Sequence, residues 1–150
     1  MQRAIDLAVE NVRLGLGGPF GAVVVRDGII IGSGANSVTA TNDPTAHAEV
    51  MAIRAACRSL NAFQLTDCEI YTSCEPCPMC LGAIYWARPA RVYFAATRAD
   101  AAAAGFDDAH IYDELNLALE KRTVPCAQIL RDQAQEAFRV WRETTHRIPY

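Results

Sequence analysis

Length, charge and apolar content restrict what this chain can be. Its 150 residues fit one domain, and 17 acidic against 14 basic residues give a net charge of −3. That balance does not favour nucleic acid as a partner, because nucleic acid binds basic surfaces. The apolar runs at 22–25 and 29–31 are far shorter than the roughly 20 residues that cross a bilayer, so we expect no membrane span.

Cysteine usage indicates a reducing compartment. Six cysteines without a recognisable signal peptide are typical of free thiols and a metal site, whereas a framework of disulfides is typical of secreted chains. We therefore expect a cytoplasmic protein. The cysteines stand at positions 57, 68, 74, 77, 80 and 126.

The N-terminal part predicts a helix followed by a β-hairpin. Residues 2–16 carry apolar side chains at helical spacing, and Gly17 ends that pattern. The expected apolar face consists of Ile5, Val9, Val12 and Leu16. Two extended runs, 20–26 and 29–36, then flank Asp27-Gly28, a dipeptide that favours a hairpin turn because both residues tolerate positive φ.

The middle of the chain predicts two helices and two strands. Asp43 offers an N-cap and Pro44 a first helical residue, which predicts a helix over 44–60. Its expected buried stripe is Val50, Ile53, Cys57 and Leu60. Strands are expected at 68–73 and 90–96, and a helix that starts at a proline of 76–78 and ends at residue 86 is expected between them.

The C-terminal third predicts one more strand and a closing helix. The stretch 99–104 is expected to be irregular or weakly helical, 125–131 to be a strand, and 132–143 to be an amphipathic helix. Ala134, Phe138 and Trp141 are expected to face inward from that helix. Helices alternate with strands and no composition shift marks a boundary, so the prediction is a single α/β domain over 1–150.

Two short segments, 47–49 and 76–80, together predict a zinc site. Cys77 and Cys80 are three residues apart at a helix start, which places both sulfurs on one side of the first turn. His47 is the expected third ligand. On a regular helix His47 and Glu49 point about 200° apart, so both reach one metal only if their helix meets it end-on.

A closed site is the alternative. His47, Cys74, Cys77 and Cys80 would make a four-ligand structural zinc site, and an iron–sulfur cluster ranks lower because no fourth cysteine stands in a matching position. Glu49 favours the open site, since a zinc that holds water needs a nearby group to take the proton. Cys74 is then a packing thiol.

His-x-Glu followed by Pro-Cys-x-x-Cys is the signature of the zinc-dependent nucleobase deaminases. The stretches 17–25, 42–50, 71–89 and 104–112 closely resemble the small bacterial guanine deaminases, over nearly the whole chain. The resemblance implies a three-layer α/β/α sandwich around a mixed sheet of about five strands, as in cytidine deaminase. It also implies one zinc per subunit, hydrolysis of guanine to xanthine and ammonia, and a homodimer that swaps residues 132–150.

The resemblance also assigns roles to site residues. Glu49 would carry the proton, Asp108 would recognise the base and help the amino group leave, and Tyr150 would close the pocket. An acidic group suits guanine because its N1–H and amino group are two adjacent donors. Asn36 is the candidate for guanine's acceptor edge. Phe20 and Trp86 either stack on the base or pack in the core.

Three other functions remain open at this point. Relatives with the same signature act on cytosine or on adenosine in transfer RNA, and triazines and aminopurines present edges similar to that of guanine. After deamination of cytosine or of adenosine in transfer RNA, and deamination of triazines or aminopurines, the third alternative is a zinc-binding module without catalytic activity. A transfer RNA substrate would favour a basic face, and this chain is mildly acidic.

Overall fold

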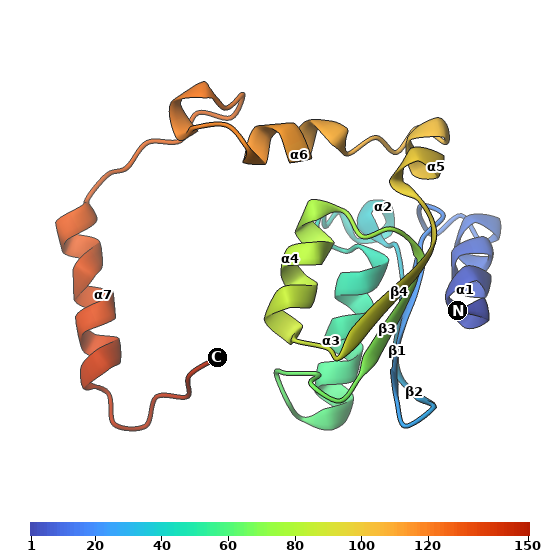
Figure 1. The fold of residues 1–150 in the computed structure, drawn as a ribbon, viewed down its shortest axis with the longest axis horizontal. Helices are drawn as coiled ribbons and strands as arrows, with labels where there is room; N and C mark the ends of the chain where they lie inside the picture. The colour runs from blue at the N-terminus through green and yellow to red at the C-terminus, as the bar shows by residue number, and fades with distance from the viewer. The chain divides into compact units, whose positions relative to one another are not determined.

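A computed structural model describes all residues, 1–150, as two compact units, Met1–Ala109 and His110–Tyr150. The first unit is built on one mixed sheet of four strands in the order β2-β1-β3-β4 (Figure 1). Strand β1 pairs antiparallel with β2 and β3, and β4 runs parallel to β3. The strands are β1 (Gly21–Arg26), β2 (Ile29–Ala35), β3 (Glu69–Cys74) and β4 (Arg91–Ala96).

Helices cover both faces of this sheet, which confirms the expected three-layer α/β/α sandwich (Figure 1). Helix α1 lies on one face, and α3 and α4 lie on the other. A buried apolar cluster under α3 and α4 includes Val24, Leu65, Ile70 and Ile84. The helices of this unit are α1 (Gln2–Arg13), α2 (Val38–Thr41), α3 (Ala48–Leu60), α4 (Pro78–Ala87) and α5 (Arg98–Ala103).

The predicted hairpin is confirmed. Asp27 and Gly28 both have positive φ, 51° and 77°, and they join β1 to β2 in an antiparallel pair. This backbone matches the right-handed twist of the strands, which is why the Asp-Gly pair suits the turn. Pro78 likewise occupies the first turn of α4 as expected.

Small residues bring α3 close to the sheet. The prediction of which residues form the buried face of this helix is wrong. The fully buried face consists of Ala48, Ala52 and Ala56, whereas Ile53, Cys57 and Leu60 are only partly buried against the core. A Cβ on Gly32 would lie 2.7 Å from the carbonyl oxygen of Ala52. The helix backbone therefore rests directly on glycines of β2, and larger side chains are displaced to the flanks.

Replacing Gly34 by alanine is expected to destabilise the fold by about 1–3 kcal/mol, because the new Cβ would overpack this contact. It would meet the carbonyl oxygen of Ala48 and lie 2.6 Å from the amide nitrogen of Ala52. Gly82→Ala is the matched control, since nothing lies within 4 Å of a Cβ there and alanine favours helix α4. Urea unfolding of both variants measures the difference, and equal stabilities would contradict the close packing.

The apolar face expected for the first helix is also wrong. Ala4, Ala8 and Asn11 are buried, whereas Val9 and Val12 are exposed. A Cβ on Gly21 would collide with the backbone of Ala4 and Ala8, so α1 approaches β1 through its small residues. Val9 and Val12 therefore lie on the outer side of the helix, Ile5 is only partly buried, and Leu16 is exposed beyond the helix end at Arg13.

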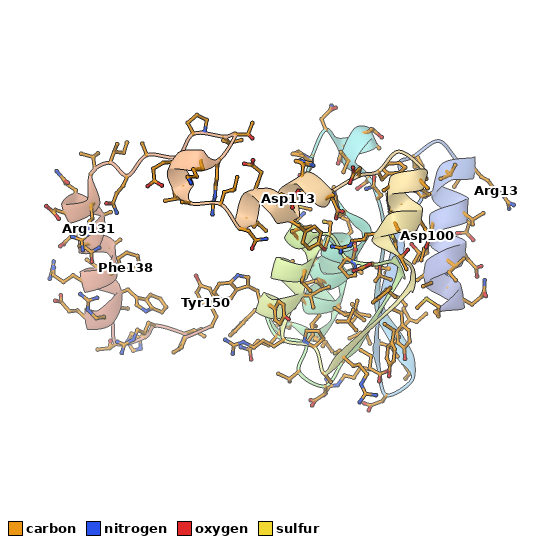
Figure 2. All side chains as sticks on the ribbon, turned by 45° about the horizontal axis from the view of Figure 1, so that its top comes forward. Arg13, Asp100, Asp113, Arg131, Phe138 and Tyr150 are labelled. Atoms are coloured by element: carbon orange, nitrogen blue, oxygen red, sulfur yellow. The ribbon has the colours of Figure 1, made fainter.

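The second unit lacks a buried core. The unit contains most of α6 (Ala109–Leu115), the 3₁₀ turn Leu119–Lys121 and α7 (Arg131–Glu143), and none of these elements has a buried residue. The strand predicted at 125–131 is not formed, because no neighbouring strand pairs with it within one chain. Ala134, Phe138 and Trp141 are exposed, contrary to the expected inward orientation, and Figure 2 shows Phe138 projecting from α7.

No helix of the chain combines the length and apolar composition that a bilayer crossing requires.

Candidate active site

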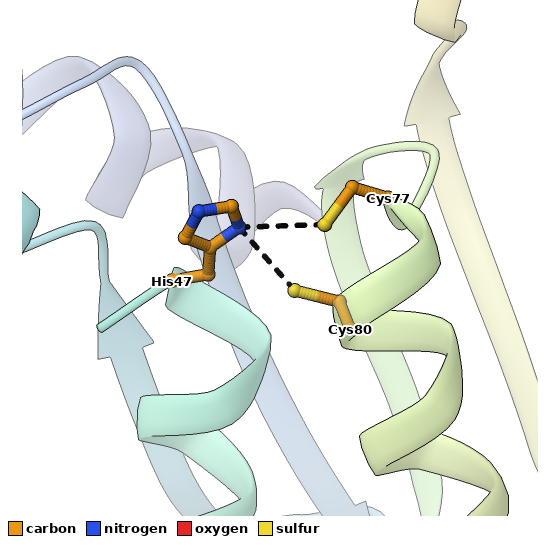
Figure 3. Close-up of side chains that lie close together, drawn as sticks. All are labelled: His47, Cys77 and Cys80. Carbon is orange, nitrogen blue, oxygen red and sulfur yellow. Dashed lines mark hydrogen bonds between the residues drawn. The ribbon is translucent and has the colours of Figure 1, made fainter. Parts of the chain in front are cut away.

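Three side chains that are distant in the sequence converge on one point in the first unit. The ligand atoms of His47, Cys77 and Cys80 all lie within 4.8 Å of one another. Nδ1 of His47 is 3.5 Å from the sulfur of Cys77 and 3.5 Å from that of Cys80 (Figure 3). Two sulfurs and one imidazole nitrogen are a donor set that zinc prefers, and three protein ligands leave one position open.

Two helix N-termini create this convergence. His47 is the N-cap of α3 and Cys77 is the N-cap of α4, each with extended backbone before the first helical turn. The N-terminal ends carry partial positive charge, which favours thiolates and other anionic groups. The site therefore lies where two helix dipoles meet.

The predicted start of the second helix, with Asp43 as N-cap and Pro44 as first helical residue, is wrong, and the difference explains the geometry of the site. Helix α3 begins at Ala48, while the Asp43 carboxylate accepts hydrogen bonds from the backbone and hydroxyl of Thr45 in a turn ahead of it. His47 is therefore outside the helix and Glu49 is inside its first turn. Because His47 precedes the helix, its imidazole and the carboxyl group of Glu49 are not held 200° apart and can both reach the metal site.

The two thiols differ in protonation in the absence of metal. A hydrogen bond from the Cys80 thiol lowers the pKa of Cys77 to about 4, and a hydrogen bond from His47 acts in the same direction. The same hydrogen bond to Cys77, together with burial, raises the pKa of Cys80. Cys77 is thus a thiolate at neutral pH and Cys80 its proton donor. A divalent cation bound here would replace the proton that the sulfurs share.

Glu49 lies beside this triad. Its side chain is only 6% exposed, and burial raises the pKa of its carboxyl group. The residue lines the same cavity as His47 and Cys77. A buried carboxyl group with a raised pKa is suited to accept and return a proton near neutral pH.

Cys74 is buried but is not part of the triad. Its thiol donates to the carbonyl oxygen of Thr97 at 3.5 Å, and the cluster of metal-ligating atoms does not include it. This arrangement favours the open three-ligand site over the closed four-ligand alternative.

Serine in place of Cys74 is expected to leave zinc stoichiometric and deamination measurable, because the hydroxyl can also donate to Thr97. Metal content by atomic absorption and ammonia release measure the two effects. Loss of zinc in this variant would instead support a four-ligand site.

A cavity of about 690 Å³ opens in front of the triad and Glu49. Three of the residues that the sequence suggests for substrate binding line it: Phe20, Asn36 and Asp108. Trp86 does not line it and is 65% exposed on α4, because the helix turns this side chain away from the core. Tyr150 belongs to the second unit and is 72% exposed.

Phe106 is a cavity residue that the sequence reasoning missed. Its ring lies 5.0 Å from that of Phe20 at an interplanar angle of 87°, so the two rings form an edge-to-face corner of the cavity. The signal that could have found it is its place between Gly105 and Asp108 in the sequence, and both of these residues also line the cavity. Glu75 is another, and its carboxylate accepts a hydrogen bond from the backbone of Arg98 at 3.1 Å.

Comparison with known proteins places this site in a class. The family of the cytidine and deoxycytidylate deaminase zinc-binding region matches residues 1–96, and the chain belongs to this family. The match confirms the predicted deaminase resemblance and, together with the clustered donor set, confirms zinc as the cofactor.

Within that class the chain is similar over its whole length to an enzyme named for guanine. The chain is 57% identical to guanine deaminase of Bacillus subtilis (strain 168) over 150 residues, which covers 100% of this chain and 96% of the relative. The crystal structure of guanine deaminase from Bacillus subtilis matches with a TM-score of 0.97 over 99% of this chain and 95% of that one. By contrast, a tRNA-specific adenosine deaminase of Aquifex aeolicus is 49% identical over only 78 residues, 52% of each chain.

Proposed function

We propose that this protein is a zinc-dependent hydrolase that deaminates guanine to xanthine and ammonia. The observation that carries the proposal is the triad of His47, Cys77 and Cys80 beside a buried Glu49, in a chain similar over its whole length to a guanine deaminase. This reaction begins the breakdown of a purine base, so the protein serves purine catabolism. Free cysteines throughout the chain favour the cytoplasm as its location.

Zinc held by the triad would supply a water that ionises near neutral pH, because the cation lowers the pKa of a water in its open position. Glu49 acts as general base and then as general acid. Its carboxylate takes a proton from the attacking water and passes it to the ring nitrogen beside C2 of guanine. Burial keeps this carboxyl group away from bulk solvent, so the proton is returned to the substrate. The hydroxyl group now on C2 then gives up its remaining proton, which Glu49 passes to the amino group, so that the amino group leaves as ammonia and C2 becomes a carbonyl.

Asp108 and Asn36 recognise opposite kinds of groups on the base. The Asp108 carboxylate accepts from N1–H and the amino group, and the Asn36 amide donates to the acceptor edge. The corner formed by Phe20 and Phe106 offers aromatic faces and edges to the base plane.

Asparagine in place of Asp108 is expected to lower kcat/KM for guanine by about 10- to 100-fold and to leave zinc content unchanged. The amide replaces one acceptor by a donor, which faces a donor of the base. Asp107→Asn is the matched control, because Asp107 accepts from the backbone of Ala109 at 2.9 Å and asparagine can accept there too. Steady-state kinetics decides, and an unchanged kcat/KM would remove Asp108 from the site.

A panel of free bases tests the substrate. The purified zinc protein is incubated with guanine, adenine, cytosine, 2-aminopurine and a triazine, and ammonia release is followed. We expect guanine to have the highest kcat/KM. Release from cytosine or adenine at the guanine rate would overturn the assignment, and release from none of them would support a zinc module without catalytic activity.

The assembly proposed here is a homodimer in which residues 132–150 of one subunit complete the other, so that 1–150 functions as one domain only in the pair. The support is chemical: α7 exposes Phe138, Val140 and Trp141, and the outer face of α1 exposes Val9 and Val12. A helix with a strongly apolar face and no core of its own needs a surface to cover it. In this arrangement Tyr150 closes a partner's pocket.

Remixing subunits tests the exchange. One parent carries Glu49→Gln and an intact tail, and the other has Glu49 but lacks residues 132–150. Each parent is expected to be inactive, and dimers formed after joint unfolding and refolding are expected to regain activity. Mixed dimers that form and stay inactive would mean that each tail closes its own pocket.

A further inference from the structure

Asn11 is a buried polar residue that the proposed reaction does not use. It lies in the body of α1, where asparagine is a poor helix former, and its side chain is 5% exposed. It is not among the residues that line the cavity. A buried amide in such a position is retained only if its hydrogen bonds are satisfied.

Both hydrogens of the Asn11 amide are used. Nδ2 donates to the carbonyl oxygen of Gly18 at 2.9 Å and to that of Asn36 at 2.8 Å. Only an NH₂ group can donate to two carbonyl oxygens at once, so the chemistry of the partners determines the orientation of the amide. Asn11 thereby ties the loop after α1 to the chain just after β2.

The two tied segments are adjacent walls of the cavity. Gly17, Gly18 and Asn36 all line it. A Cβ on Gly17 would collide with the carbonyl oxygen of Asn36 and lie 3.1 Å from Nδ2 of Asn11. The two walls therefore touch through backbone, and the Asn11 amide joins them by donating to a carbonyl oxygen of each.

This junction also orients the Asn36 side chain. Its Oδ1 accepts from the backbone N–H of Gly18 at 3.3 Å and from that of Val38 at 3.4 Å. Both bonds are longer than most N–H···O bonds, so a shift of Gly18 would break the first and leave only the long bond from Val38 to orient the amide. With Oδ1 engaged by two donors, Nδ2 is the end of the amide that can donate to a ligand in the cavity.

We infer that Asn11 is a positioning residue for substrate recognition: it holds Gly18 against Asn36 so that Asn36 presents Nδ2, and not Oδ1, to the acceptor edge of the base. The inference rests on the proposed function and deepens it. Asn11 acts on the substrate only through Asn36. Loss of its two donors would free Gly18 and let the Asn36 amide rotate, which weakens binding of a base with an acceptor edge and leaves zinc and Glu49 in place.

A double-mutant cycle tests this role. Asn11→Asp, which keeps the shape but removes the two donors, and Asn11→Ala are each made alone and together with Asn36→Ala. Both single changes at Asn11 are expected to lower kcat/KM for guanine by about 5- to 100-fold, mainly through KM, with unchanged zinc content. In the Asn36→Ala background the same changes are expected to alter kcat/KM by less than about twofold.

Gln2→Glu is the matched control, since it makes the same amide-to-acid change at an exposed position of α1 where the amide donates to Asp6. An equal factor in both backgrounds, an unchanged kcat/KM, or loss of zinc would overturn the inference. Failure of both Asn11 variants to fold would overturn it too, because the residue would then be purely structural. A wild-type protein that is inactive on guanine would instead overturn the proposed function, and the inference with it.

Discussion

Glutamine in place of Glu49 is expected to lower kcat for guanine at least about 100-fold while zinc stays bound. The amide keeps the size and shape of the side chain but cannot take a proton from water or return it to the ring. We expect His47, Cys77 and Cys80 to stay in place, because the oxygen of the new amide can still accept the hydrogen bond that the Cys80 thiol shares with Glu49. Steady-state ammonia release and metal content measure the two halves of the prediction.

The fold of this variant is expected to be at least as stable as the wild type in the metal-free state. Burial raises the pKa of Glu49, so the fold carries the cost of a poorly solvated acid that a neutral amide avoids. Glu10→Gln, an exposed change on α1, controls for the substitution itself. Substantial residual turnover in Glu49→Gln would refute the proton-carrying role.

Removal of zinc is expected to abolish deamination and to lower the melting temperature, and adding zinc back is expected to restore both. The cation would join the N-termini of α3 and α4, whose ligands are separated by 30 and 33 positions in the chain, so its binding free energy adds to folding. Cys77→Ala is expected to lose activity that added zinc does not recover. Cys126→Ser, an exposed cysteine far from the triad in sequence, is the control.

Zinc affinity of the metal-free protein is expected to fall as pH is lowered. The hydrogen bond to Cys77 and burial raise the pKa of Cys80, and the hydrogen bond with Cys77 raises that of His47. Both groups must lose a proton to ligate, so protons compete with the metal more strongly at lower pH. A competition titration with a chromophoric chelator at several pH values measures this, and a pH-independent affinity would contradict the shared-proton state of the triad.

Local chemistry was enough to predict several features of this protein. The Asp27-Gly28 turn, the start of α4 at Pro78 and the pairing of Cys77 with Cys80 follow from backbone preferences and spacings within a few residues. The grouping of His47 with the two cysteines required one further step, the knowledge that zinc needs a third ligand. The similarity to a guanine deaminase is not confined to these short segments, since it extends over all 150 residues of the chain.

Packing between distant segments decided the rest. The start of α3 at Ala48, and not at Pro44, depends on how the turn before it reaches the site, and this places His47 outside the helix. Alanines, and not the larger apolar residues of α3, form its buried face because glycines on β2 admit the helix backbone. Neither glycine nor alanine produces a clear apolar period in a sequence, so the spacing pointed to the wrong face.

The orientation of the Asn36 side chain also could not be predicted from the local sequence. Its place at the end of β2 was visible in the sequence, but which end of the amide faces the cavity depends on Gly18, Val38 and, through Gly18, on Asn11. Those residues meet only in the folded chain. Residues 125–131 have a strand-like sequence but no partner strand within one chain, because backbone hydrogen bonds of a sheet require a neighbour that local sequence cannot specify.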